Sequence, residues 1–418
     1  MFVALLLALA QPPAEPRDVA ALIDHGLARE QAGDLDGAIA AYDEAIRLRP
    51  SSARAFLWRG RLWRLKGDPD RALADYNRAI EFEPLNDQGY AGRGDLWLEK
   101  YDYARAAADY GEAIRLNPQH APYYELRGYS RQCSRDKDGA EADFTRYISL
   151  RPADPLGYFR RGRLRVDAGE YDRSIPDHDE AVRLKPDHAD ALYDRGFAYD
   201  GMKEFDRALA DFAAAARAKP NWAYPHMARA AVHLQRSAPA AALEAYAAAI
   251  AADPNHAPAF DRRAWLRATS PDAAVRDGEA AAADARRACE LTRWQKGDYI
   301  DTLAAAEAEC GRFDEAVRYE KQALANATYA KSPPAGWARA RLKLYEEGKA
   351  YRDGADAEVP PAARAPWTER GMAELAVKVG GVVVVLLLVG FRLRRHGVWP
   401  FARRGPPATA DSPTPPGP

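Results

Sequence analysis

Residues 53–86 read ARAFLWRGRLWRLKGDPDRALADYNRAIEFEPLN, and this stretch contains the pattern that decides the fold. A proline near its end, Pro84, returns at a constant interval along most of the chain. The series is Pro50, Pro84, Pro118, Pro152, Pro186, Pro220 and Pro254, with equal gaps throughout. Equal gaps of about 34 residues indicate an internal repeat rather than a row of separate globular domains.

Each copy of the repeat divides into two halves with helical periodicity. In the quoted copy, Phe56 and Gly60 belong to the first half, and Tyr76 and Ala79 belong to the second. Spacings of three, four and seven residues place such side chains on one stripe, so each half predicts an amphipathic helix. The small residues allow the two helices to approach closely, and the proline ends the second helix. A glycine such as Gly67 is expected in the turn between them, in the left-handed conformation.

This order of large, small, aromatic, alanine and proline positions resembles the tetratricopeptide repeat, a helix-turn-helix unit of about 34 residues. The resemblance implies stacked units, because one helix pair cannot cover its own apolar stripe. We therefore expect an all-α fold, an α-α superhelix of about nine repeats over residues 19–330. An insert is expected near residues 268–278, and a closing helix is expected over residues 331–352.

Several residues depart from the regular pattern. Ser174, Pro176 and His178 replace an alanine, a helix former and an aromatic in the fifth repeat, whose second helix is therefore expected to start late or bend. Three histidines lie two residues after repeat prolines and are interpreted as loop residues, too far apart to share a metal ion. They are His120, His188 and His256.

Arginine also recurs at the repeat interval in the first half of each copy, and aspartate recurs with the same period in the second half. The arginines are Arg59, Arg93, Arg127, Arg161, Arg195, Arg229 and Arg263. The aspartates are Asp75, Asp109, Asp143, Asp177 and Asp211. The arginines alone would also suit an anion-binding stripe. The shared period favours a ladder of ion pairs that ties the helices together.

Composition and motifs argue against several classes of function. The chain of 418 residues carries 60 Lys and Arg against 61 Asp and Glu, which lacks the positive excess of a nucleic-acid binder. Cys133, Cys289 and Cys310 are too few and too scattered for a disulfide framework or a zinc site, and we expect apolar fillers. Phosphate-binding loops, nucleophile elbows and zinc-protease signatures are lacking. We therefore expect no enzyme activity, cofactor or metal.

The family resemblance implies that first helices line a concave groove that binds a protein or peptide. Mapped by register, the candidate partner-binding residues are Arg54, Arg61, Arg64, Tyr129, Phe159, Arg163, Tyr193, Phe197, Tyr224 and Trp265. A basic entrance followed by an aromatic wall suits an extended or helical peptide, although some rings are expected to pack between repeats. The Lys and Asn positions of the family's chaperone-tail clamp carry other residues here, so an acidic chaperone tail is not expected.

Both ends of the chain carry apolar segments. Residues 1–10 resemble a signal peptide, with an uncleaved anchor or a mis-set start as alternatives. After a linker over residues 353–371, residues 372–391 predict a transmembrane helix, with a buried core segment as the alternative. The tail over residues 392–418 is basic, proline-rich and expected to be disordered. The positive-inside rule places this tail in the cytoplasm and the repeats outside it.

Together these observations predict a membrane-anchored scaffold for protein-protein interactions, which binds a partner peptide or helix in the groove. A second hypothesis makes the chain a regulatory subunit. In that case its short basic tail would act on anionic lipid or on a cytoplasmic enzyme.

Overall fold

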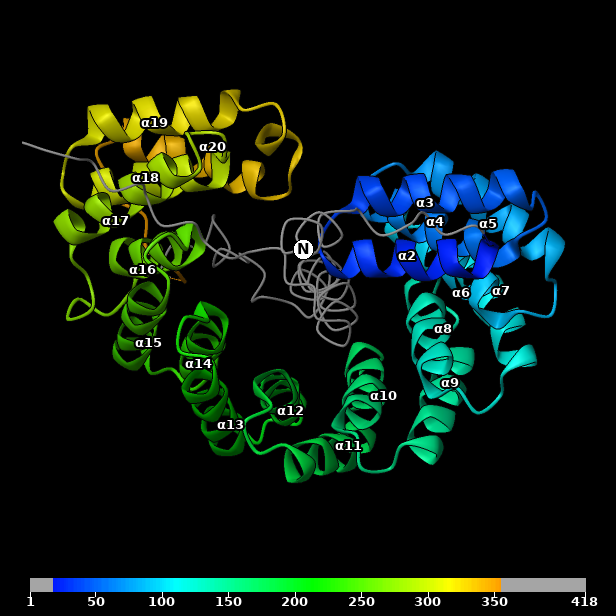
Figure 1. Ribbon diagram of the computed structural model, residues 1–418. Helices are drawn as coiled ribbons and strands as arrows, with labels where there is room; N and C mark the ends of the chain where they lie inside the picture. Colours follow the sequence, from blue (N-terminus) through cyan, green and yellow to red (C-terminus); the bar gives the residue numbers. More distant parts are fainter. Residues whose placement is uncertain (1–17, 355–418) are drawn as a thin grey trace, which may run out of the picture. The chain divides into compact units, whose positions relative to one another are not determined.

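The computed structural model describes residues 18–354 (Figure 1). They fall into two units, residues 18–135 and residues 136–354, which we describe separately. The expected signal peptide, the transmembrane helix over residues 372–391 and the basic tail lie outside the described residues, as does nearly all of the linker. Among residues 18–354, no helix has both the length and the apolar character needed to span a bilayer.

Both units consist of α-helices joined by short turns, and the described residues contain no β-strand. The first unit comprises α2 (Val19–Gln31), α3 (Leu35–Leu48), α4 (Ala53–Leu65), α5 (Pro69–Phe82), α6 (Asp87–Glu99), α7 (Tyr103–Leu116) and α8 (Ala121–Cys133). The second unit comprises α9 (Lys137–Leu150), α10 (Pro155–Asp167), α11 (Tyr171–Leu184), α12 (Ala189–Gly201), α13 (Phe205–Ala218), α14 (Ala223–Gln235), α15 (Pro239–Ala252), α16 (Ala257–Thr269), α17 (Gly278–Leu291), α18 (Gly297–Glu309), α19 (Phe313–Ala325), the 3₁₀ turn η1 (Tyr329–Lys331) and α20 (Pro334–Glu346). The predicted all-α fold is therefore confirmed for this part of the chain.

The turn inside each of the seven repeats from α2 to α15 has one backbone conformation regardless of sequence. Gly33, Gly67 and Gly169 have φ values of 82°, 76° and 73°, as expected for a left-handed cap. Other residues take the same place in further repeats, in register with these glycines. They are Tyr101, Arg135, Lys203 and Ser237, with φ between 55° and 66°. The packing of the helix pair therefore imposes this conformation, even where a side chain makes it unfavourable.

First and second helices of a repeat approach each other closely at a glycine. A Cβ atom on Gly196 of α12 would lie 2.7 Å from the ring of Phe212 on α13. On Gly162 of α10 it would lie 2.8 Å from the imidazole of His178 on α11. Real Cβ atoms do not approach other atoms this closely. The small residue is thus required, as the sequence predicted, and the second-helix ring packs directly on first-helix backbone.

The predicted arginine–aspartate ladder is present in both units. The Arg59 guanidinium on α4 donates from Nε and Nη2 to the two carboxylate oxygens of Asp75 on α5, at 2.8 and 2.7 Å. Its Nη1 donates to Asp43 on α3, in the preceding repeat, at 2.6 Å. The same two-pronged pair recurs in Arg93–Asp109, Arg161–Asp177, Arg195–Asp211 and Arg263–Asp284. The Arg59 fork therefore joins three helices of two neighbouring repeats.

The second helix of the fifth repeat corrects one expectation. Helix α11 begins at Tyr171, in register with the other second helices, and includes Pro176 as its sixth residue. The expected late start is wrong, because a proline this near the beginning removes only one helical hydrogen bond. Nearby carbonyls gain other donors: Ser174 Oγ donates to the carbonyl of Tyr171, and Arg165 Nη1 donates to that of Arg173.

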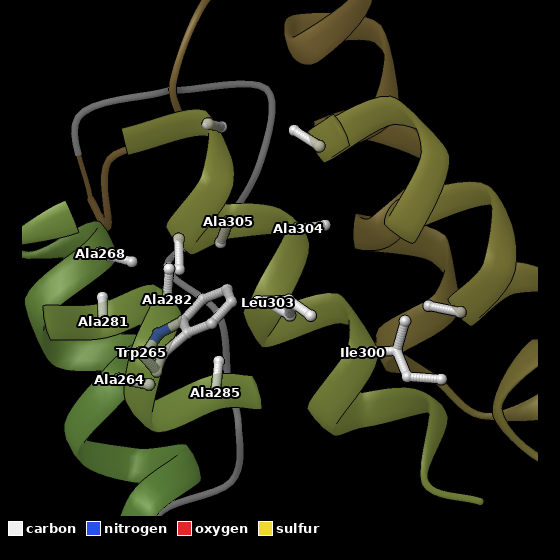
Figure 2. Packing of buried hydrophobic residues seen from close by; sticks show 14 of the residues in the cluster. Ala264, Trp265, Ala268, Ala281, Ala282, Ala285, Ile300, Leu303, Ala304 and Ala305 are labelled. Carbon is white, nitrogen blue, oxygen red and sulfur yellow. The ribbon is translucent and has the colours of Figure 1, made fainter. Parts of the chain in front are cut away.

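The last helices form an alanine-rich core that also holds several large rings. Trp265 of α16 lies among Ala282 and Ala285 of α17 and Leu303 of α18 (Figure 2). After α16, residues 270–277 form an irregular connection before α17 begins. Helix α20 packs on α19 and α18, and the residues after it return to α16, where the Asp353 backbone N–H donates to the Thr269 carbonyl at 2.9 Å.

A glycine at a strained turn position should stabilise the second unit. Ser237 has φ 55°, is exposed and makes no side-chain hydrogen bond. We expect Ser237→Gly to raise the free energy of unfolding by about 1 kcal/mol, because glycine adopts this conformation without steric cost. Urea unfolding followed by circular dichroism measures the change. Ala168→Gly, at a cap with φ −89°, is the control and should destabilise. If Ser237→Gly and Ala168→Gly changed the free energy of unfolding equally, the backbone of Ser237 would not be strained.

Candidate functional site

First helices gather on one side of each unit. Consecutive first helices contact one another, as α4 contacts α6 and α10 contacts α12. In the second unit, α10, α12 and α14 lie on one side, with α11, α13 and α15 behind them (Figure 1). We call the surface formed by α10, α12, α14 and α16 the first-helix face. It carries most of the partner-binding residues expected from the sequence.

In the first unit, the expected basic entrance is largely neutralised. Arg54 is exposed, and no ion pair is found for it among the described residues. Arg61 pairs with buried Glu30, and its guanidinium lies 5.0 Å from the Trp58 ring centre. Arg64 donates to Glu99 at 2.5 Å and lies 3.7 Å from Asp95. These acids come from neighbouring first helices, so two of the three arginines hold repeats together.

Two further aromatic residues expected in the groove pack at least partly between helices. Tyr129 of α8 is half-buried and meets Tyr103 of α7 edge to face, with ring centres 6.5 Å apart. Phe159 of α10 is 7 % exposed, and its ring centre lies 4.9 Å from that of His188. Interior packing of this kind was expected for some of the rings.

Aromatic rings pack against one another at three places along α10, α12 and α14. The ring centre of Tyr193 lies 4.7 Å from that of Phe197 and 4.6 Å from that of Trp222. Phe197 in turn lies 5.2 Å from Phe212 of α13. Tyr224 meets His256 edge to face at 5.1 Å. We call this group the aromatic seam. It comprises Phe159, His188, Tyr193, Phe197, Trp222, Tyr224 and His256.

The seam includes three residues that the sequence-based prediction did not assign to it. His188, Trp222 and His256 are the residues immediately before α12, α14 and α16. They follow one another at the repeat interval, so the same periodicity that revealed the repeat contained this signal. The two histidines do lie in the loops before these helices, as expected, and their rings additionally pack against Phe159 and Tyr224. The ring just before each of these helices contacts an aromatic side chain of a first helix.

Acidic groups lie beside the seam. Asp194 of α12 is buried, and its Oδ2 lies 3.9 Å from Nε of Arg163 on α10 without a hydrogen bond. Burial raises the pKa of Asp194 to about 7, opposed by Arg163 and assisted by Asp167 and Asp190. Three carboxyl groups thus surround one arginine. Acidic groups therefore outnumber basic ones at this place, which favours a cationic group on a partner.

Trp265 is not available on the first-helix face. Its Nε1 donates to Asp353 at 2.9 Å, and its ring centre lies 6.1 Å from that of Tyr351. The Arg341 guanidinium of α20 lies 5.2 Å from the same ring. The segment that follows α20 thus covers this tryptophan, which is 7 % exposed. The expectation that Trp265 lines an open groove is not met, because the chain itself fills that place.

The remaining polar clusters offer no inorganic site. Among residues 18–354, no group of three or more His, Cys, Asp and Glu side chains is arranged to hold a metal ion. Cys289 is fully buried among alanines, and Cys133 and Cys310 are partly buried.

The fold and this face define a class of protein, the solenoids of two-helix repeats that present a first-helix surface. Residues 23–88 and 159–221 match the family profile of the tetratricopeptide repeat. The chain therefore contains tetratricopeptide repeats in both units. Comparison with curated proteins found no match.

Several solved structures are similar to part of the chain. YrrB, described as a TPR protein with an unusual peptide-binding site, is 22 % identical with a TM-score of 0.41, over 47 % of this chain and 98 % of that one. A tetratricopeptide repeat protein from Parabacteroides merdae is 21 % identical with a TM-score of 0.46, over 58 % and 96 %. MamA is 24 % identical with a TM-score of 0.37, over 38 % and 94 %.

The buried histidine beneath Phe159 should make the second unit sensitive to acid. His178 occupies the second-helix aromatic position, and burial, with Arg195 and Arg163 nearby, lowers its pKa to about 3. Below pH 6.5 the unfolded chain binds a proton that the folded chain does not, so stability falls as the pH drops from 6.5 towards 3. Between pH 7 and 5 the contribution of His178 to this loss is about 2 kcal/mol. Asp194 acts in the opposite direction, because its raised pKa lets the folded chain take up a proton in the same range.

We expect His178→Phe to remove that loss, because Phe212 fills the equivalent place against Gly196. The urea midpoints of both proteins at pH 7 and pH 5 measure the effect. A variant that loses as much stability on acidification as the wild type would show that His178 is not responsible.

Proposed function

We propose that this protein is a non-enzymatic scaffold that binds a partner segment on the first-helix face of its second unit. The aromatic seam is the observation that carries this proposal. Phe197 and Tyr224 are half-exposed members on adjacent first helices, and the buried Tyr193 ring packs against Phe197 and Trp222. Rigid rings held in this way provide a large contact area at little entropic cost.

The chemistry of the face indicates which partner it suits. Asp194, Asp190 and Asp167 lie beside the seam with Arg163 as the nearby cation. An apolar side chain on the rings and a Lys or Arg beside the acids would satisfy both parts of the surface. The preferred partner is therefore a protein segment that carries an apolar anchor next to a basic residue.

Photo-crosslinking in the native cell tests this proposal with the full chain. The benzophenone amino acid p-benzoylphenylalanine replaces Phe197 in one variant, Tyr224 in a second, and Met202 in a third. Met202 follows α12 and is 40 % exposed, so it serves as the control. We expect positions 197 and 224 to cross-link the same partner and position 202 not to do so.

An alanine pair completes that test. Phe197→Ala with Tyr224→Ala should reduce recovery of the partner by about tenfold or more, since two aromatic anchors are lost. Met202→Ala should leave it unchanged. Undiminished recovery from the alanine pair, with helix content intact, would rule out the seam as the binding surface.

We further propose that the scaffold is exported and held at a membrane by residues 372–391. The support is the sequence itself, since five arginines follow this apolar segment against one acid. Reporter fusions test the topology. A reporter that is active only outside the cytoplasm should function when inserted near Gly354 and fail when fused after residue 418. Activity of a cytoplasm-specific reporter near Gly354 would refute export.

A further inference from the structure

The arginine–aspartate ladder is interrupted at Arg229 of α14. Every other arginine with a described ladder pair meets an aspartate on the second helix of its own repeat, sixteen residues onward or, at Arg263, twenty-one. For Arg229 the residue sixteen onward is Ala245 of α15. The residue sixteen before it, where Asp43 and Asp179 supply the second acceptor in other repeats, is Ala213 of α13.

Arg229 consequently has no partner among the described residues. Its Nε is buried and makes no hydrogen bond, and no ion pair involves its guanidinium. The corresponding Nε atoms of Arg195 and Arg161 donate to aspartate oxygens at 2.7 and 3.0 Å. A buried donor on a charged group is costly to leave unsatisfied, so this site has a strong preference for an acceptor.

The helices on either side carry only alanine at the two ladder positions, Ala245, which is buried, and Ala213, which is half-buried. Alanine makes up nine of the 14 residues of α15, and Ala240 and Ala247 are exposed. Its single charged residue, Glu244, is exposed and forms no ion pair among residues 18–354. Alanine side chains allow another backbone to approach closely, and an apolar surface of this kind favours a protein segment over a small inorganic anion.

Two histidines lie on the same helix as Arg229 and sense its charge. Burial together with the charge of Arg229 lowers the pKa of His226 and of His233. Arg236 also acts on His233. The lowered pKa values keep both imidazoles neutral near pH 7, and Arg236 pairs with Asp206 at 2.6 Å, so the positive charge at this place is that of Arg229 itself.

We propose that Arg229 is a binding site for a carboxylate side chain, Asp or Glu, which a partner protein inserts between α13 and α15 in place of the missing ladder aspartate. The guanidinium would donate two hydrogen bonds to this carboxylate, in the geometry that Arg195 shows with Asp211. This surface involves second helices, whereas the proposed peptide site lies on the first-helix face. The protein would thus hold two partners, or two parts of one partner, at once.

Filling the gap from within gives the sharpest test. Ala245→Asp restores the ladder pair, so it should raise the urea midpoint of the full-length protein while it blocks the external carboxylate. Ala240→Asp adds the same charge to an exposed place on the same helix and is the matched control. Arg229→Gln removes the charge of the guanidinium. It tests the same site if Ala245→Asp does not fold.

Binding is measured with an acetylated, amidated alanine-rich peptide that carries one central aspartate. The same peptide with asparagine and inorganic phosphate are the comparisons. NMR titration should show the aspartate peptide binding the wild type and Ala240→Asp in the millimolar range, at least about tenfold more tightly than the asparagine peptide. Ala245→Asp and Arg229→Gln should each lose this difference.

Three results would overturn the proposal: equal binding of the two peptides, retention of the difference in Ala245→Asp, or binding of phosphate alone. The alanine pair at Phe197 and Tyr224 should leave the peptide titration unchanged. Loss of the seam function therefore remains distinguishable from loss of the Arg229 site.

Discussion

The arginine fork that recurs on α4, α6, α10, α12 and α16 is the interaction on which the rest of the structure depends. In the repeat of Arg59 it holds Asp75 of its own repeat by two hydrogen bonds and Asp43 of the preceding repeat by a third. The fork can reach both only if the first helix lies against two second helices at fixed depth. That depth requires glycine at Gly196 and its counterparts, where the second-helix ring rests on backbone. The ion pair of the arginine fork therefore fixes how the first helix is aligned with the two second helices, and so which apolar side chains are buried between them.

The two faces of the second unit follow from this arrangement. First helices turn their aromatic residues towards one another, which produces the seam around Tyr193 and Phe197. Second helices present the ladder, and its carboxylates are satisfied wherever both members are present. The repeat of Arg229 keeps the arginine and lacks the aspartate. The donor that is part of a structural contact in other repeats is therefore left without an acceptor, and the fold is unchanged. Binding specificity in such arrays can arise from the omission of a consensus residue.

Periodicity in the sequence predicted the helices, the glycine contacts and the ladder, because each depends on residues within one or two repeats. It did not predict the environment of Trp265, whose indole donates to Asp353, 88 residues away. No repeat pattern contains such a contact. The role of His188 and His256 was missed for another reason, since Trp222 between them completes a series that a search for one residue type overlooks. Pro176 was expected to displace its helix, but the ladder and the ring of His178 hold α11 in register.

The most direct test of this account is an NMR measurement of arginine Nε–H resonances in the full-length protein. Assignment by single Arg→Lys substitutions would identify Arg59, Arg93, Arg161, Arg195, Arg263 and Arg229. We expect the five paired arginines to show shifts typical of carboxylate hydrogen bonds, unchanged by the aspartate peptide. Arg229 should lack such a shift when free and acquire it when the peptide is added. A free Arg229 that already resembles the five paired arginines would show that the ladder is not interrupted there, and would contradict the account.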